Sequence, residues 1–175
     1  EQFKREFILH SAIADQFGYR LSIHSGSDKL SVYPIIGELT NERVHVKTAG
    51  TSWLEALKVI ASKKPALFRA IYAFALEHFA EATAYYHVTT DISKVPDAEA
   101  IPDTDLKKIL QQADGRQLLH ITYGLVLTAK NADGSYRFRD ALYKTLDVEE
   151  QAYADTLFLH IQKHLLKLGM EVFRA

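Results

Sequence analysis

Two turns of the chain each follow a short run of alternating apolar and polar residues, and they combine charged side chains with small ones. The first turn lies in YRLSIHSGSDK, residues 19–29, and the second lies in VHVKTAGTSW, residues 44–53. His24 supplies an imidazole, the commonest side-chain ligand for a transition metal. Lys29 and Lys47 supply ammonium groups that can pair with a carboxylate or a phosphate. The two turns therefore predict a site for an anionic small molecule next to a cation.

The remaining residues of the two turns favour a ligand that carries many hydroxyl groups. Glycine lets backbone N–H groups approach a ligand closely, and the N-terminus of a following helix attracts an anion. Serine and threonine hydroxyls can bind sugar oxygens. The candidate ligand-binding residues are Ser25, Ser27, Asp28, Lys29, Lys47, Thr48, Gly50 and Thr51, and His24 is the candidate metal ligand.

The same residues also have simpler explanations. A single histidine at the end of a strand is more often a hydrogen-bonded structural residue than a ligand, and Ser-Gly-Ser is an ordinary loop composition. Lys47 is more informative, because a lysine buried in an apolar strand needs a partner or a function. We interpret His45 as a packed side chain. The histidines that we interpret as surface or core residues of helices are His10, His78, His160 and His164, and His87 is a minor candidate for function.

The elements that position these turns follow from the spacing of apolar residues. Gly18 stands where a helix C-cap belongs, Ser52 and Glu55 form a capping box, and Pro34 interrupts a helix that ends near Leu39. The spacing predicts helices over 3–17, 28–39, 53–63, 65–83, 105–112 and 139–169, the last broken near Asp147, and strands over 19–24, 44–48 and 85–90. Residues 116–128 fit either a helix or a strand, and a capping box of Asp114 and Gln117 favours the helix.

Short strands that alternate with longer helices indicate an α/β protein with parallel strands. Three strands are few for a doubly wound sheet but suit the second half of a (β/α)8 TIM-type barrel, whose full length is typically ~250 residues. We expect residues 1–175 to be a single domain, the C-terminal portion of such a barrel with additional C-terminal helices.

In a barrel, side chains alternate between the interior and the helix layer. Leu21, Ile23, Val44 and Val46 should face the helices, and Ser22, His24, His45 and Lys47 should face the interior. We therefore expect His24 and Lys47 to share one water-accessible pocket at the same end of adjacent strands.

Composition and missing motifs exclude several functions. The net charge of −1, from 21 basic and 22 acidic residues, provides no field that would attract nucleic acid or a membrane. The chain has no cysteine, so disulfides and thiolate zinc sites are excluded, which is compatible with a reducing cytoplasm. Without GxGxxG, GKS/T, GxSxG or HExxH, dinucleotide, P-loop and elbow-type hydrolase chemistry lose support.

HSGSDKLSVYPIIG and HVKTAGTSWLEALKVIA together resemble the tagaturonate epimerase family, and YYHVTTDISKVPDA and RQLLHITYG continue the resemblance. The resemblance implies a barrel enzyme of the isomerase class that uses a divalent metal cation. Such an epimerase interconverts tagaturonate and fructuronate, which are ketose sugar acids (ketouronates), in cytoplasmic carbohydrate metabolism during hexuronate breakdown.

The resemblance also implies that the chain is the C-terminal part of a longer protein. His24 would then be one metal ligand, and the other ligands and the catalytic acid and base would lie upstream. The isolated chain should be inactive until the missing N-terminal part, or another chain, completes the barrel.

The reaction leaves two routes open, because the epimerised carbon lies beta to the ketone. One route is retro-aldol cleavage followed by re-addition, and the other begins with proton transfer elsewhere on the ketose. Two other functions also fit the residues. One is a metal-dependent barrel acting as a sugar aldolase, with Lys47 as a Schiff-base nucleophile, or as a ketose isomerase. The other is a non-catalytic sugar-acid-binding domain.

Overall fold

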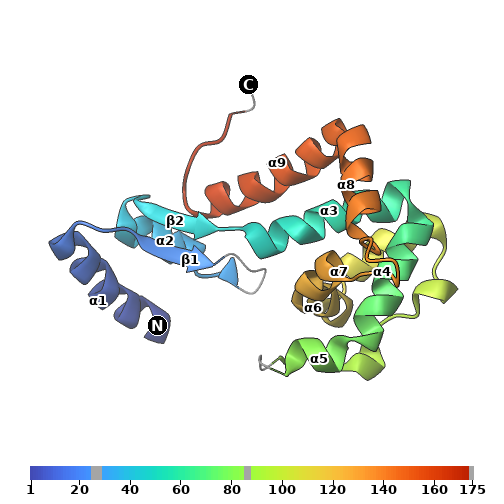
Figure 1. Cartoon of the computed structure of the whole chain (residues 1–175). Coiled ribbons are helices and arrows are strands. Elements are labelled where there is room, and N and C mark those ends of the chain that lie inside the picture. Colours follow the sequence, from blue (N-terminus) through green and yellow to red (C-terminus); the bar gives the residue numbers. More distant parts are fainter. Residues whose placement is uncertain (25–28, 85–87, 174–175) are drawn as a thin grey trace. The chain divides into compact units, whose positions relative to one another are not determined.

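The computed structural model describes residues 1–24, 29–84 and 88–173, and Figure 1 traces the chain from blue to red. The chain divides into two compact units. We call residues 1–51 with 157–175 the sheet unit and residues 52–156 the helical unit. The expectation that residues 1–175 form a single domain stays a prediction.

The sheet unit carries the two predicted turns. Its elements are α1 (Gln2–Phe17), β1 (Leu21–His24), α2 (Tyr33–Thr40), β2 (Val44–Lys47), the start of α3 (Ala49–Lys63) and the end of α9 (Glu150–Lys167). Gly18 ends α1 with a φ of 71°, in the left-handed region that glycine adopts without a steric penalty. The strands β1 and β2 pair in parallel, and α2 supplies the crossover that a parallel pair requires.

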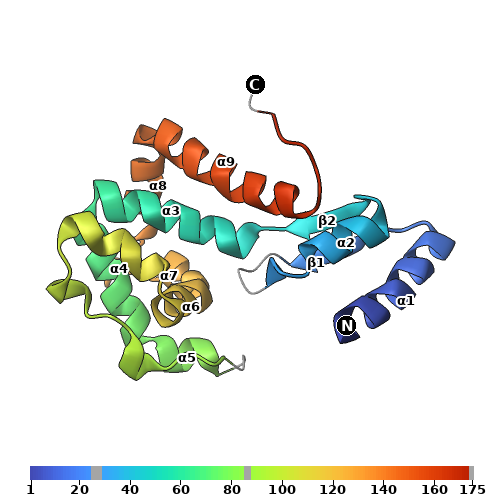
Figure 2. The same ribbon diagram turned by 180° about the vertical axis from the view of Figure 1, so that it is seen from behind.

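One face of the strand pair builds the core of the sheet unit. The half-buried side chains of the two strands, Leu21, Ile23, Val44 and Val46, pack against a cluster of Phe7, Tyr33, Ile36 and Leu168. Figures 1 and 2 show α2 lying against the strand pair. The prediction that these four apolar strand residues face the helices is confirmed.

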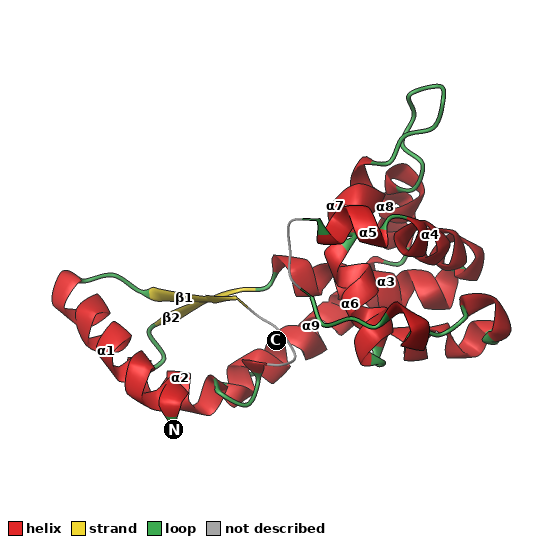
Figure 3. Ribbon diagram, turned by 90° about the horizontal axis from the view of Figure 1, so that it is seen from below, coloured by secondary structure: helices red, strands yellow, loops and turns green. Residues whose placement is uncertain are grey.

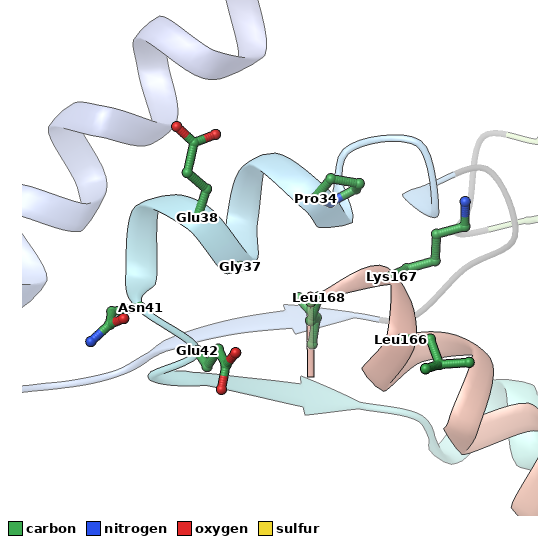
Figure 4. A pocket seen from close by; sticks show the side chains of 9 residues that line it. Pro34, Gly37, Glu38, Asn41, Glu42, Leu166, Lys167 and Leu168 are labelled. Atoms are coloured by element: carbon green, nitrogen blue, oxygen red, sulfur yellow. The ribbon is translucent and has the colours of Figure 1, made fainter. Parts of the chain in front are cut away.

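The end of α9 docks closely on α2. Figure 4 shows Leu168 beside Gly37, and a Cβ atom added to Gly37 would collide with the Leu168 carbonyl oxygen. Leu168 is only 3% exposed. An open hollow of about 540 Å³ next to this contact is lined in part by Glu38, Glu42 and Lys167. The backbone contact at Gly37 therefore holds the C-terminal segment in the sheet unit.

The helical unit has a separate core. Its elements are the remainder of α3 and α9, α4 (Pro65–Glu77), α5 (Phe79–Thr83), α6 (Ala113–Ile121), α7 (Tyr123–Thr128), α8 (Arg139–Val148) and 3₁₀ turns at Ile92–Lys94, Ala98–Ala100 and Asp103–Leu110. The Trp53 indole N–H donates a hydrogen bond of 2.9 Å to the Leu119 carbonyl inside this core. The Arg69 guanidinium donates to the carbonyls of Ala98 and Ile101, which fixes the irregular segment between α5 and α6.

The buried side chain of Tyr72 also holds this segment. Its hydroxyl donates a hydrogen bond of 2.7 Å to the Pro96 carbonyl, and burial raises the pKa of Tyr72 above its usual value. The tyrosine therefore stays protonated and remains a donor.

Several local predictions are wrong for identifiable reasons. Pro34 stands in the first turn of α2 and begins the helix instead of interrupting it, because its missing N–H would have no intrahelical acceptor there. Ser52 lies inside α3, which begins at Ala49, so it does not cap that helix. The cap of α6 is Gln112, whose side chain accepts from the Gly115 N–H, and not Asp114.

The ambiguous and C-terminal segments are helical. Residues 116–128 belong to α6 and α7, so the preference for helix is confirmed. The helical stretch 139–169 breaks between Val148 and Glu150, close to the predicted position. Of the predicted strand 85–90, residues 85–87 lie outside the described residues, and residues 88–90 are not in a strand.

The described chain is mostly helical, with one small two-stranded parallel sheet in residues 1–24, 29–84 and 88–173 (Figure 3). This matches the α/β class only in part, and the barrel stays a prediction. Within those residues, the helices are too short or too polar to traverse a lipid bilayer.

Replacing Gly37 by alanine should destabilise the protein by about 1–3 kcal/mol, because the added methyl group collides with backbone atoms of Leu168. Gly124 in α7 is the matched control, since a Cβ atom added there would meet nothing within 4 Å. In a helix, glycine to alanine is normally favourable by about 1 kcal/mol. Thermal denaturation should give a lower Tm for Gly37→Ala and an unchanged or higher Tm for Gly124→Ala. Equal Tm values would contradict the close contact.

Candidate functional site

The second face of the strand pair is polar and open. Ser22 and His24 of β1 and His45 and Lys47 of β2 are all exposed, and they alternate with the half-buried apolar residues. The period of two along each strand therefore sorts the side chains as the sequence predicts. The polar face lies opposite the core of the sheet unit.

His24 and Lys47 are register partners at the carboxyl ends of their strands. The ladder pairs His24 with Lys47, and each is the last residue of its strand. Side chains directly opposite each other on one face of a sheet are neighbours. The imidazole and the ammonium group thus lie at the same end of adjacent parallel strands, and both are accessible to water. Their role in binding stays a prediction.

His45 belongs to this polar face, so its interpretation as a packed side chain is wrong. Its Nδ1 atom lies 2.8 Å from the hydroxyl oxygen of Ser22, its register partner. The hydrogen bond fixes the ring on the same face as His24. The alternation of VHVK, which pairs His45 with Lys47 on one face, was the sequence signal for this placement.

A hollow of about 570 Å³ adjoins His24. It is lined by Phe3, Ser22, Ile23, His24, Lys29, Val32 and Ile36. The lining includes residues from both faces of β1 and none from β2, which places the hollow along the edge of β1. His24 and Lys29 both line it together with apolar side chains, whereas Lys47 does not line it. Its volume is in the range of small-molecule sites.

The second turn ties the start of α3 to the end of β2. Thr51 is 3% exposed, and its hydroxyl donates a hydrogen bond of 2.9 Å to the Thr48 carbonyl. The Thr51 N–H donates to the same carbonyl at 3.0 Å. Gly50 lies in the first turn of α3, between these two residues. The turn that follows Lys47 therefore has a defined conformation.

Three predicted ligand-binding residues, Ser25, Ser27 and Asp28, lie outside the described residues, as does His87. Lys29 follows the first gap and is exposed. The structure thus brings His24, Lys29 and Lys47 to one end of the sheet, and Thr48 and Thr51 to the turn beside it.

The described residues supply one part of a metal site at most. In 1–24, 29–84 and 88–173, the side chains of His, Asp and Glu form no group of three or more that could hold a metal ion. An exposed imidazole at the end of a strand is suited to act as one ligand of such an ion. The other ligands would have to come from outside the described part.

The structure connects His160 to the second turn. The sequence predicts only a surface or core residue of a helix at this position. The His160 Nε2 atom lies 2.8 Å from the Thr51 hydroxyl oxygen. His164, one turn later, is only 4% exposed. The spacing of four residues, which puts both rings on one face of α9, was the available signal. His10 is exposed on α1, as interpreted.

The chain matches one protein family over nearly its whole length. The family model described as tagaturonate epimerase covers residues 1–168. A tagaturonate/fructuronate epimerase from Thermotoga maritima is 47% identical over 165 residues, which is 94% of this chain and 33% of the relative.

Solved structures of a similar protein agree with this match. The native crystal structure of the fructuronate-tagaturonate epimerase UxaE from Cohnella laeviribosi has a TM-score of 0.88 and 54% identity over 97% of this chain and 35% of that chain. A structure of the same protein with one glycerol has a TM-score of 0.89. The chain spans about a third of the length of these relatives and corresponds to their C-terminal part.

Proposed function

This chain belongs to the tagaturonate epimerase family, and we propose that it forms the C-terminal part of an enzyme that interconverts tagaturonate and fructuronate. The relatives that carry this activity in their names match it over nearly all of its residues. The pairing of His24 with Lys47 on the open face of the sheet is the observation that supports a role for particular residues. An imidazole and an ammonium group at one strand end suit a ligand that has both a ketone and a carboxylate.

The open polar face supports completion of the sheet by other strands. Parallel sheets are normally covered on both faces, and two strands alone are marginal. The described sheet buries one face against α1 and α2 and leaves the other exposed. Strands from the rest of the longer protein, or from another chain, would extend it into a (β/α)8 barrel. His24 and Lys47 would then face the barrel interior at its carboxyl end, where active sites of this architecture lie.

His24 is the residue of this chain that would hold a divalent cation, together with ligands supplied from elsewhere. When bound, such a cation acts as a Lewis acid on the ketone and an adjacent hydroxyl oxygen. His24 would supply an imidazole lone pair to the cation from the end of β1. Lys29 lines the hollow beside His24, and its ammonium can donate hydrogen bonds to oxygen atoms of the substrate.

Lys47 and the second turn would bind the carboxylate and the hydroxyls. The Lys47 ammonium provides a positive charge, and the N-terminus of α3 directs backbone N–H groups toward an anion. Ser25, Ser27, Asp28, Thr48 and Gly50 remain the candidates for contacts with the sugar hydroxyls and for close backbone approach. The predicted contact from Thr51 is not retained, because its hydroxyl is buried and bonds to the Thr48 carbonyl and to His160.

This binding mode serves both routes to epimerisation. In the retro-aldol route, the bond between the α carbon and the epimerised carbinol carbon breaks and leaves an aldehyde. The aldehyde group rotates, and the same bond then forms again on the opposite face of its carbonyl carbon. In the other route, proton transfer on the ketose comes first. In both routes, the residues that bind the carboxylate hold one end of the substrate in place, so that only the reacting part of the substrate moves.

The direct test uses the full-length protein with purified fructuronate, and ¹³C NMR to follow the appearance of tagaturonate. We expect the same equilibrium mixture from either substrate, loss of turnover after chelation, and recovery with a divalent metal. Binding without turnover under any metal would instead favour the sugar-acid-binding domain.

His24→Ala in the full-length protein should lower metal occupancy and reduce kcat/KM by about 100-fold or more, because one side chain that binds the metal directly is lost. The control is His10→Ala, since His10 is exposed on α1 and is not among the residues that line the hollow beside His24. Metal analysis and kinetics check both. Unchanged occupancy and turnover in His24→Ala would remove this residue from the site.

Lys47→Met should raise KM by about 10- to 100-fold, because the charge that pairs with the substrate carboxylate is lost. Lys47→Arg should recover part of the loss, and Lys163→Met, an exposed change on α9, should have no effect. A KM for Lys47→Met equal to that of the wild type would rule out the carboxylate contact.

Borohydride reduction in the presence of substrate provides a separate check on Lys47. An epimerase of this kind should give no trapped adduct. Covalent trapping at Lys47 would instead indicate the Schiff base of an aldolase.

A further inference from the structure

A hydrogen bond joins the second turn to a helix that is far away in sequence. The His160 Nε2 atom of α9 lies 2.8 Å from the Thr51 hydroxyl oxygen, across a separation of 109 residues. Both residues belong to the sheet unit. Thr51 is almost fully buried and His160 is half-buried, so this contact is partly shielded from water.

The proton positions in this contact follow from the partners of Thr51. The Thr51 hydroxyl has one proton, and it donates that proton to the Thr48 carbonyl, which can only accept. The contact with His160 therefore requires the imidazole to donate, with its proton on Nε2. His160 is the donor that holds the Thr51 oxygen, and Thr51 in turn holds the Thr48 carbonyl.

The His160 ring is itself held by neighbouring aromatic groups. The His164 Nδ1–H donates a hydrogen bond of 2.7 Å to the His160 carbonyl. The two rings meet edge to face, with centroids 4.5 Å apart. The His164 ring also contacts that of Tyr33 in α2, at 5.5 Å. His164 and Tyr33 are both buried, so His160 approaches Thr51 from a rigid base.

We propose that His160 is a positioning residue for the reaction. Its bond to Thr51 holds the turn Thr48–Thr51, directly after Lys47, in the conformation that receives the anionic end of the substrate. This rests on the proposed function. The direction of the N–H groups at the start of α3 depends on this turn, and a misplacement of about 1 Å at a site can cost roughly 100-fold in rate. The end of α9 thus acts on the site through Thr51.

The test is a double-mutant cycle in the full-length protein. His160→Leu and Thr51→Val should each raise KM for fructuronate by about tenfold or more, and the double variant should be no worse than the poorer single variant, because both break the same bond. His160→Gln, which keeps an N–H near the Nε2 position, and Thr51→Ser, which keeps the hydroxyl, should retain KM within about threefold.

Thr40→Val is the matched control. The Thr40 hydroxyl donates to the Ile36 carbonyl at 2.8 Å within α2, so its loss removes a comparable backbone contact that does not involve His160. This variant should keep the wild-type KM and kcat. A KM increase in Thr40→Val as large as that in Thr51→Val would overturn the proposal, because any lost helix contact would then suffice.

Hydrogen exchange of the peptide covering residues 48–54 gives a measurement that needs no activity. His160→Leu and Thr51→Val should both accelerate exchange there by about tenfold, because the turn opens more often. Loss of thermal stability with unchanged KM and kcat would show a purely structural contact and overturn the proposal. Unchanged hydrogen exchange of residues 48–54 in both variants would also overturn the proposal. If His160→Leu fails to fold, a comparison of KM and hydrogen exchange between Thr51→Val and Thr51→Ser tests the same proposal.

Failure of the proposed function has a different outcome. A wild-type protein that does not convert fructuronate would reject the epimerase activity, and with it the catalytic role of His160. The wild-type kinetics thus report on the proposed function, whereas the variants of an active enzyme report on His160.

Discussion

The parallel pairing of β1 with β2 is the interaction on which the candidate site depends. Its hydrogen-bond register sets His24 against Lys47 at the carboxyl ends of the strands. A slip of one strand by one residue would turn the polar side chains of that strand to the apolar face and separate His24 from Lys47, because side chains alternate along a strand. The packing of Leu21, Ile23 and Val46 against the helices opposes such a slip. The core on one face therefore fixes the polar groups on the other.

The end of α9 supports the same region through contacts of different kinds. His160 bonds to Thr51, His164 packs against Tyr33, and Leu168 meets the backbone of Gly37. These contacts extend from the second turn to α2, and they bring the end of α9, from Leu157 onward, into the unit that carries the polar face. A helix near the end of the chain is thus part of the framework of the candidate site.

The sequence predicts what depends on local periodicity and misses what depends on distant partners. The alternation of LSIH and VHVK is enough to sort core from polar residues, since burial on one face imposes a period of two. The capping box at Ser52 and Glu55 is wrong because the turn before it, tied at Thr48 and Thr51, starts α3 earlier. His160 could be placed on a helix face, but its partner lies 109 residues away.

A crystal structure of the full-length protein with bound tagaturonate would test the central claim most directly. We expect the substrate to lie at the carboxyl ends of β1 and β2, with its carboxylate in contact with the Lys47 ammonium and His24 at its ketone end. A substrate bound elsewhere, with His24 and Lys47 both more than about 6 Å from it, would contradict this claim, because groups at that separation make no direct contact.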